Sequence, residues 1–314
     1  MFKKYYNPNL QYAKNGFRYN NYTYFLKEKF GERIQRILID GGFTCPNRDG
    51  TKGKSGCIYC NNKSFSPFVN LSDNSIKSQI MAGFNYFNKL NAKKFIAYFQ
   101  SHTNTYAPVP ELKKKYYEAI KFPEVVGIAI STRPDCLDQD ILELLKELNN
   151  ITYLNVEIGI ESILDKSLNW MNRKHDYQTT VEAIEKLADL GIDVTGHIIL
   201  GLPTETQNEM LEMVKKLNEL PLKFLKIHHL QVIKNTPLAN IHKNKPIKLF
   251  DYNEYLEFVS KFISHLKQDI ILQRIFADAP LELLIAPNWH KRSPEIIMDL
   301  QKLMRDNDLY QGKY

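Results

Sequence analysis

Residues 34–60 read IQRILIDGGFTCPNRDGTKGKSGCIYC and join a short apolar run to a loop that carries three cysteines. Cys45, Cys57 and Cys60 are spaced C-x11-C-x2-C, and Cys136 is the only other cysteine in the chain. Iron-sulfur clusters are usually held by cysteine thiolates, and a [4Fe-4S] cluster held by three leaves one iron open to a small molecule. The spacing therefore favours a catalytic iron-sulfur site.

Zinc is the first alternative, because a C-x2-C pair is also half of many structural zinc sites. Zinc would need a fourth ligand such as His102 or Cys136, and the sequence has no second C-x2-C pair and no H-x3-H pair. A disulfide framework is less favoured. Four cysteines in 314 residues, without a signal peptide or an apolar run of membrane length, indicate a reducing setting, and we expect a cytoplasmic protein with no membrane partner.

Positive charge is concentrated at the end of the chain that carries the cysteine loop. The net charge is +7, and residues 1–63 hold 12 Lys and Arg against four Asp and Glu. In residues 1–30 lysines and arginines alternate with aromatic residues, a composition that suits single-stranded RNA. The alternative is that these rings pack on the domain and only the lysines are solvated. The rings concerned are Tyr5, Tyr6, Tyr12, Phe17, Tyr19, Tyr22, Tyr24 and Phe25.

From residue 34 onward, short β-branched runs alternate with segments of helical period. Strands are expected at 34–39, 95–99, 125–130, 153–158, 192–199 and 224–230. Helices are expected near 74–90, 110–121, 138–149, 176–190, 204–219 and 251–267. Pro110 fits a first helical turn, Asp176 and Thr204 fit N-caps, and Gly191 fits a left-handed C-terminal position. Six successive βα units result.

The cysteine loop follows the first of these strands and so lies at the carboxyl edge, where α/β barrels build their active sites. No G-x-G-x-x-G follows any strand, which argues against a dinucleotide-binding sheet. We expect an α/β fold, a partial (β/α)6 TIM-like barrel, over residues 31–268, preceded by an arm of residues 1–30. A strand at 270–276 and a helix at 293–306 would belong to a C-terminal extension, 269–314, packed on the barrel.

Three cysteines after the first strand of six βα units resemble the radical S-adenosylmethionine (SAM) superfamily. Within it, the chain is similar to the YhcC/YtqA-type branch, which is related to the catalytic subunit of Elongator. Six segments carry this similarity in order: 40–62 (DGGFTCPNRDGTKGKSGCIYCNN), 131–137 (STRPDCL), 156–175 (VEIGIESILDKSLNWMNRKH), 196–206 (GHIILGLPTET), 226–238 (KIHHLQVIKNTPL) and 283–290 (LLIAPNWH).

The resemblance implies a [4Fe-4S] cluster on Cys45, Cys57 and Cys60, with SAM chelating the fourth iron. Reductive cleavage of SAM would give a 5′-deoxyadenosyl radical that abstracts hydrogen from the substrate, so an electron donor such as flavodoxin or ferredoxin is an expected partner. Tyr59 is placed like the aromatic residue beside the adenine, or is an ordinary loop aromatic. Arg173 resembles the arginine that meets the SAM carboxylate, or is a solvent-exposed charge at a helix start.

One departure concerns the Gly-Gly-Glu that many members carry after the second strand. Here residues 98–106 read YFQSHTNTY, so Gln100, Ser101 and His102 are the candidates to receive the SAM amino group. His102 is also a candidate substrate-facing acid or base, because it follows the carboxyl end of a strand, or it is an ordinary loop histidine.

The end of the fourth strand carries further cofactor candidates. A carboxylate in a buried parallel strand must find a partner or face the barrel mouth, so Glu157 and Glu161 are candidates for the SAM ribose or amino group, with Ser162 alongside. Gly201 allows close backbone approach. Arg133 is a candidate for the cofactor or for an anionic substrate.

Other residues near the expected barrel mouth have weaker claims. Cys136 is a candidate thiol for quenching or capturing a radical, although a single cysteine is more often inert. Either His228 or His229 must point inward if the strand has period two. Trp289 and His290 would cover the site or simply pack.

The leading hypothesis is a radical SAM enzyme that modifies tRNA, at a wobble-uridine side chain. Its expected form is hydrogen abstraction from an existing substituent, leading to trimming or rearrangement, without the acetyl-CoA-driven carboxymethylation of Elongator. Two alternatives remain: a radical SAM enzyme that acts on a small metabolite or peptide, and a non-catalytic RNA-binding module stabilised by zinc.

Overall fold

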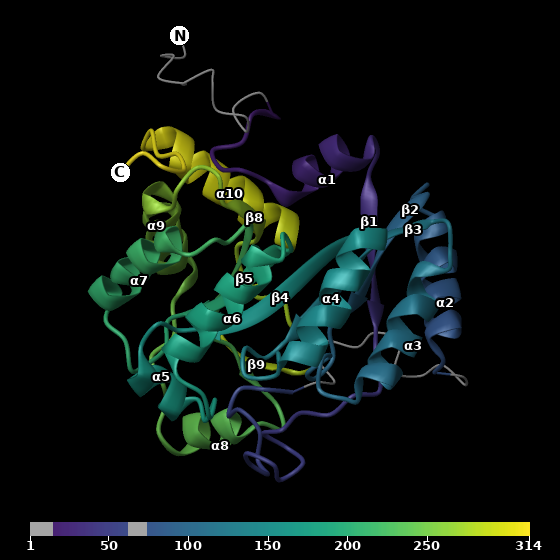
Figure 1. The fold of residues 1–314 in the computed structure, drawn as a ribbon. Coiled ribbons are helices and arrows are strands. Elements are labelled where there is room, and N and C mark those ends of the chain that lie inside the picture. The colour runs from purple at the N-terminus through teal and green to yellow at the C-terminus, as the bar shows by residue number, and fades with distance from the viewer. Residues whose placement is uncertain (1–14, 62–73) are drawn as a thin grey trace.

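Seven parallel strands form one curled sheet in the order β1-β2-β3-β4-β5-β6-β8 (Figure 1). The computed structural model describes residues 15–61 and 74–314. The strands are β1 (Ile34–Ile39), β2 (Lys94–Phe99), β3 (Val125–Thr132), β4 (Tyr153–Glu161), β5 (Asp193–Leu200), β6 (Phe224–His229) and β8 (Ile271–Arg274). The predicted partial barrel is confirmed, with a seventh strand added beside β6.

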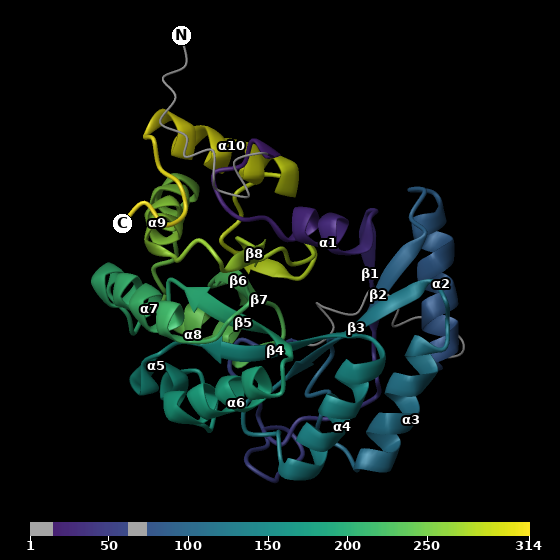
Figure 2. The same cartoon turned by 45° about the horizontal axis from the view of Figure 1, so that its top comes forward.

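Helices cover the outer face of the curled sheet (Figure 2). The crossover helices are α2 (Ile76–Asn88), α3 (Val109–Ile120), α4 (Gln139–Ile151), α6 (Tyr177–Asp189), α7 (Gln207–Glu219) and α9 (Tyr252–His265). Between helices and sheet lies a core of fully buried apolar side chains, among them Ile37, Phe99, Leu112, Tyr116, Ile130 and Ile184. Because both faces of most strands are buried, the strands were readable as apolar runs.

The helix caps explain most of the helix starts. Asp176 caps α6 by accepting from Thr179 N at 2.8 Å, as predicted. The prediction for α7 was wrong by two residues: Thr206, not Thr204, is the N-cap, and it forms a capping box with Glu209. Thr204 instead pairs its hydroxyl with that of Ser167 at 2.8 Å.

Helix α1 (Tyr22–Phe30) contacts both edge strands, β1 and β8, and so spans the opening of the sheet (Figure 2). Tyr22 and Leu26 are buried, and the rings of Tyr22 and Phe25 meet that of Phe224 edge-on, each at 5.1 Å. Of the two interpretations of the basic aromatic arm, packing holds for these rings, while Lys27 and Lys29 are exposed. Tyr5, Tyr6 and Tyr12 lie outside the described residues.

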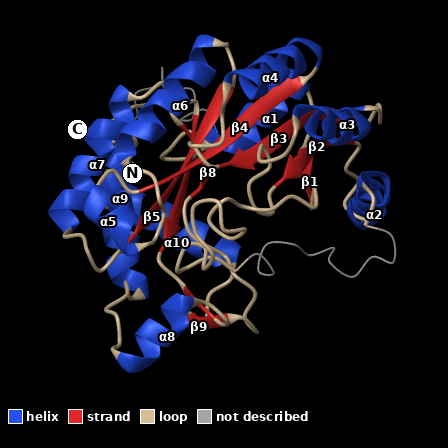
Figure 3. Ribbon diagram, turned by 60° about the horizontal axis from the view of Figure 1, so that its bottom comes forward, coloured by secondary structure: helices blue, strands red, loops and turns tan. Residues whose placement is uncertain are grey.

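The C-terminal part contributes to the sheet as well as covering it. Strand β8 pairs in parallel with β6, and α10 (Ser293–Asp306) packs on α9. The sequence did not predict α1 or the short elements α5 (Asp165–Trp170), α8 (Pro237–Asn244), β7 (Val232–Ile233) and β9 (Leu284–Ala286). Figure 3 shows β9 and α8 away from the main sheet. Among the described residues, no helix has the length and apolar character needed to cross a bilayer.

Candidate active site

A cavity of about 230 Å³ lies at the carboxyl ends of the strands. Its wall takes residues from around the half-barrel, including Gln100, Arg133, Glu161, Ile199, His228 and Arg274. Cys45, Cys57 and Cys60 all line it, and none of the three forms a disulfide. The three-cysteine loop therefore faces the position where α/β barrels carry out chemistry.

The backbone of the cysteine loop is fixed at two points. Near its start, Cys45 O accepts from Arg48 N at 2.8 Å and from Asp49 N at 3.1 Å. Near its end, Ile58 N donates to Met171 O at 3.1 Å, and Ile58 O accepts from Leu238 N at 2.9 Å. The two bonds of Ile58 tie the segment with Cys57 and Cys60 to the end of α5 and the start of α8.

Gly56 is needed for the loop to close on itself. Its φ is +71°, and a Cβ there would lie 2.9 Å from Arg48 Nε. Arg48 uses the space that is left free to donate from Nη2 to Cys60 O at 2.8 Å. A side chain at residue 56 would thus displace the arginine that holds the last cysteine.

Arg173 is the central cation on the cysteine side of the cavity. Its Nη1 lies 3.7 Å from Cys57 Sγ and 3.3 Å from Tyr59 Oη, and 3.6 Å from a carboxylate oxygen of Glu161. Its Nη2 donates to Gly159 O at 2.9 Å, and a Cβ at Gly159 would lie 2.8 Å from the same nitrogen. Burial opposes the charge, but Tyr59 and Cys57 hold the pKa of Arg173 well above its usual value.

Arg133 provides a second buried cation beside it. Its Nε and Nη2 each lie 2.9 Å from Asp135, and Nη2 also donates to Arg173 O at 2.7 Å. Burial would raise the pKa of Asp135, but the hydrogen bonds and charge of Arg133 lower it to about 2. Arg133 Nη1 is buried with no hydrogen-bond partner in the described chain. One donor is therefore left for a bound molecule.

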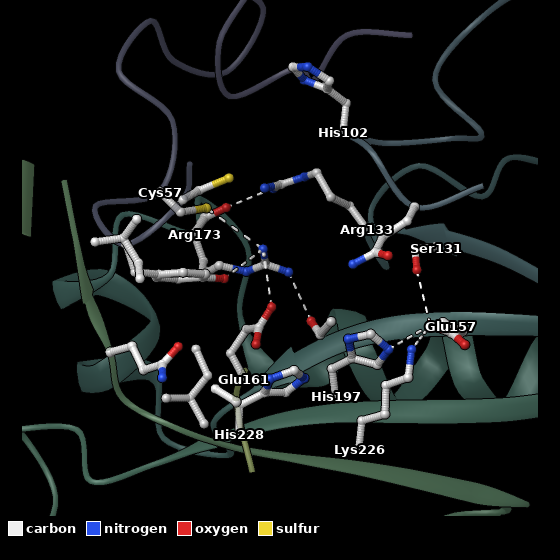
Figure 4. A pocket seen from close by; sticks show the side chains of 18 of the residues that line it. Cys57, His102, Ser131, Arg133, Glu157, Glu161, Arg173, His197, Lys226 and His228 are labelled. Atoms are coloured by element: carbon white, nitrogen blue, oxygen red, sulfur yellow. Dashed lines mark hydrogen bonds and ion pairs between the residues drawn. The ribbon is translucent and has the colours of Figure 1, made fainter. Parts of the chain in front are cut away.

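A separate polar network forms the floor of the cavity, centred on Glu157 of β4 (Figure 4). Its two oxygens accept six hydrogen bonds, one from a side chain on each of the six remaining strands of the sheet. These side chains are Arg36, Tyr98, Ser131, His197, Lys226 and Gln273. Burial raises the pKa of Glu157, but Arg36 and Lys226 outweigh it and hold the pKa well below its usual range. Glu157 therefore stays ionised with its acceptors occupied, and its role at the SAM ribose or amino group stays a prediction.

The two histidines at the end of β6 divide as the alternation of a strand requires. His228 lies on the same face as Lys226, and its ring centroid is 5.7 Å from that of His197. His229 stacks on Trp289 with ring centroids 3.9 Å apart. Burial lowers the pKa of His229 to about 3, so its ring is neutral. Trp289 thus packs, and His290 is exposed.

Four predicted residues do not line the cavity. Cys136 is buried beside Asp135, and burial followed by that charge raises the pKa of its thiol to about 12, so the predicted catalytic thiol is not in place. Ser162 is held by Glu205 and Leu164 N, and so shapes the turn after β4. Gly201, with φ +86°, makes room for Phe250, and Ser101 is buried.

Gln100 and His102 do line the cavity, and burial lowers the pKa of His102.

The sequence reasoning missed most of the floor. Arg36, His197 and Lys226 lie within apolar strands just as Glu157 does, so the rule that selected Glu157 would have selected them. The described residues contain no group of three His, Cys, Asp or Glu side chains that converge on one ion.

Comparison with known proteins gives the family. The model of the radical SAM superfamily matches residues 45–217, and that of the radical SAM C-terminal domain matches 222–306. The chain belongs to the radical SAM superfamily. YtqA of Bacillus subtilis, an uncharacterised protein, is 36% identical over 96% of this chain and 94% of its own length. This radical SAM enzyme accordingly uses a [4Fe-4S] cluster and SAM as cofactors.

Two more distant likenesses are to a tRNA-modifying enzyme and to a solved structure. The tRNA uridine(34) acetyltransferase of Methanocaldococcus jannaschii is 28% identical over 51% of this chain and 30% of that enzyme. The structure of Methanocaldococcus infernus Elp3 superimposes with a TM-score of 0.69 at 18% identity, over 88% of this chain and 64% of Elp3. The latter confirms the fold.

Proposed function

We propose that this radical SAM enzyme modifies tRNA at the side chain of the wobble uridine. The support is its similarity to the tRNA uridine(34) acetyltransferase, which covers about half of this chain. Since the match covers only 30% of that enzyme, acetyl transfer is not carried over. The proposed reaction begins with removal of a hydrogen atom from an existing uridine substituent and ends in its trimming or rearrangement.

Cys45, Cys57 and Cys60 are the proposed ligands of the cluster. The observation that carries this assignment is that three thiols outside any disulfide line one cavity with Arg173 and Glu161 at the carboxyl edge of the sheet. Asn47 Nδ2, at 3.6 Å, and Arg173 both donate toward Cys57 Sγ, and such bonds stabilise a thiolate and tune its metal. When bound, the cluster and SAM supply a radical that abstracts hydrogen, using an electron from a donor such as flavodoxin or ferredoxin.

The remaining wall on the cysteine side is proposed to hold SAM. Arg173 and Arg133 offer positive charge for its carboxylate, and Arg133 Nη1 is a buried donor without a partner in the described chain. Glu161 offers an acceptor for the ribose or amino group, and Tyr59, hydrogen-bonded to Arg173, lines the same wall. Gln100 and His102 are the other candidates for the amino group. Glu157 acts below them as a fixed, ionised floor.

Tyr19 and Tyr22 are buried against the domain, so these two rings of the arm do not support the tRNA assignment. A direct test is therefore required. tRNA nucleosides would be measured by mass spectrometry in a deletion strain complemented with the wild-type gene, Cys57→Ala or Cys136→Ala. We expect one wobble nucleoside to change on deletion, and to be restored by the wild type and Cys136→Ala but not by Cys57→Ala. Identical nucleosides in the deletion and parent strains would contradict the proposal and favour a small-molecule or peptide substrate.

A further inference from the structure

The cavity has a second end, built from β6 and β8, that the cofactor assignments leave unused. Lys226 and His228 lie two residues apart on β6, and Arg274 ends β8. All three line the same cavity as the cysteines. The side chains of His228 and Arg274 make no hydrogen bond to another described residue, and that of Arg274 is exposed, so their polar atoms are available to a ligand.

A β-bulge in β8 places Arg274 at this position. Leu225 pairs with Leu272, but the next residue, Lys226, pairs with Arg274, so β8 has one extra residue, Gln273. Such a bulge turns a neighbouring side chain toward a new face. As a result Gln273 reaches Glu157 at 3.0 Å, while Arg274 also lines the cavity.

Positive charge exceeds negative charge at this end. Arg36 and Lys226 both pair with one carboxylate, Glu157, whose oxygens accept from six donors, and the charge of Arg274 also acts on Lys226. Arg274 forms no ion pair in the described chain. Asp278, another acid that lines the cavity, is exposed and accepts from Ser293 Oγ at 2.8 Å. A cleft with an excess of one charge concentrates ligands of the opposite charge.

We propose that Arg274, with Lys226 and His228, forms a subsite that binds an anionic group of the substrate, a carboxylate or a phosphate. The inference rests on the proposed function, since it places substrate against β6 and β8 in the cavity that Arg173 and the cysteines also line. Arg173 and Arg133 are paired with Glu161 and Asp135, whereas Arg274 has no such ion pair in the described chain.

Without a ligand, the subsite disfavours the charged forms of two of its three bases. Burial lowers the pKa of His228 well below its usual value, and the charge of Arg274 lowers it further, so the ring of His228 is neutral. Burial also lowers the pKa of Lys226, although Glu157 opposes this. An anion bound between these groups would favour their charged forms, and a charge-assisted hydrogen bond to Arg274 would then be stronger than a neutral one.

The test uses the cluster-loaded protein with SAM bound, titrated calorimetrically with acetate and, separately, with inorganic phosphate. Arg274→Gln should weaken the preferred anion about tenfold or more, as expected for loss of one charged hydrogen bond. Its affinity for SAM should change less than about twofold, because SAM is assigned to the cysteine side of the cavity. Arg305→Gln, an exposed arginine on α10 outside the cavity, is the matched control and should leave both affinities unchanged.

The anion that binds more tightly identifies the group, carboxylate or phosphate. Equal anion affinity in the wild type and Arg274→Gln would overturn the subsite. An equal loss of SAM affinity would also overturn it, because Arg274 would then belong to SAM. Unchanged tRNA nucleosides on gene deletion would instead overturn the proposed function while leaving an anion site for another substrate, so the two failures are distinguishable.

Discussion

Two glutamates four residues apart on β4, Glu157 and Glu161, meet opposite environments. Glu157 accepts six hydrogen bonds and is surrounded by cations, whereas Glu161 lies at the strand end with φ +62° and is paired with Arg173 at 3.6 Å. Both are buried and both line the cavity. The difference shows that burial of a carboxylate does not by itself mark a binding residue. What marks it is whether its acceptors are already occupied.

Removing the charge at Glu157 should have the largest effect, and on stability. Glu157→Gln leaves Arg36 and Lys226 facing a neutral amide inside the barrel, so we expect the free energy of unfolding to fall by about 3–5 kcal/mol. Urea unfolding followed by circular dichroism would measure it. Glu147→Gln, which breaks an exposed pair with Lys113, is the control and should leave the free energy of unfolding nearly unchanged. Equal small losses would show that the floor network is not a structural element.

Removing the charge at Glu161 should act on binding instead. Glu161→Gln should change the free energy of unfolding by less than about 1 kcal/mol, because Arg173 retains its bonds to Gly159 and Tyr59. The dissociation constant for SAM should rise about tenfold or more, the effect of losing a charged hydrogen bond. Equilibrium dialysis on the cluster-loaded protein would measure this. Unaltered SAM binding, matching that of a Glu205→Gln control outside the cavity wall, would remove Glu161 from the site.

At pH 7, His229→Gln should have the smallest effect on the free energy of unfolding. It tests a buried group that has no opposite charge beside it. Burial lowers its pKa to about 3, against about 6.5 in an unfolded chain. Below about pH 6.5 the unfolded state binds a proton that the folded state does not, so stability falls as pH falls, by about 2 kcal/mol in total between pH 7 and pH 5. Unfolding at pH 7, 6 and 5 should show a loss smaller by that amount in His229→Gln. His290→Gln, at an exposed position, should keep the wild-type dependence of unfolding free energy on pH. If the curve for His229→Gln ran parallel to the wild-type curve, His229 would not be a buried, neutral histidine.

The sheet was largely predictable because its strands are buried on both faces and read as apolar runs. Strand β1 and helix α10 were predicted to the residue, and the cysteine loop was placed at the correct edge. The environments of Glu157 and Glu161 were not predictable, because they depend on side chains from six other strands. Helix α1 was missed since its packing across the sheet opening depends on contacts far away in the chain, such as that with Phe224.

The cysteines show the same limit. Cys57 and Cys136 both lie in loops at the carboxyl edge, and only the structure shows that one thiol faces the cavity while the other is buried beside Asp135. Sequence spacing identified the first three correctly as a group sharing one wall. The spacing did not predict which way the loop after β3 turns the thiol of Cys136.

Iron and sulfide content after anaerobic reconstitution, with 5′-deoxyadenosine formation from SAM under reduction, tests the central claim most directly. Wild type and Cys136→Ala should each bind one [4Fe-4S] cluster and cleave SAM, whereas Cys45→Ala, Cys57→Ala and Cys60→Ala should lose both properties. A cluster that survives Cys57→Ala, or is lost with Cys136→Ala, would contradict the assignment of the three-cysteine loop as the cluster site.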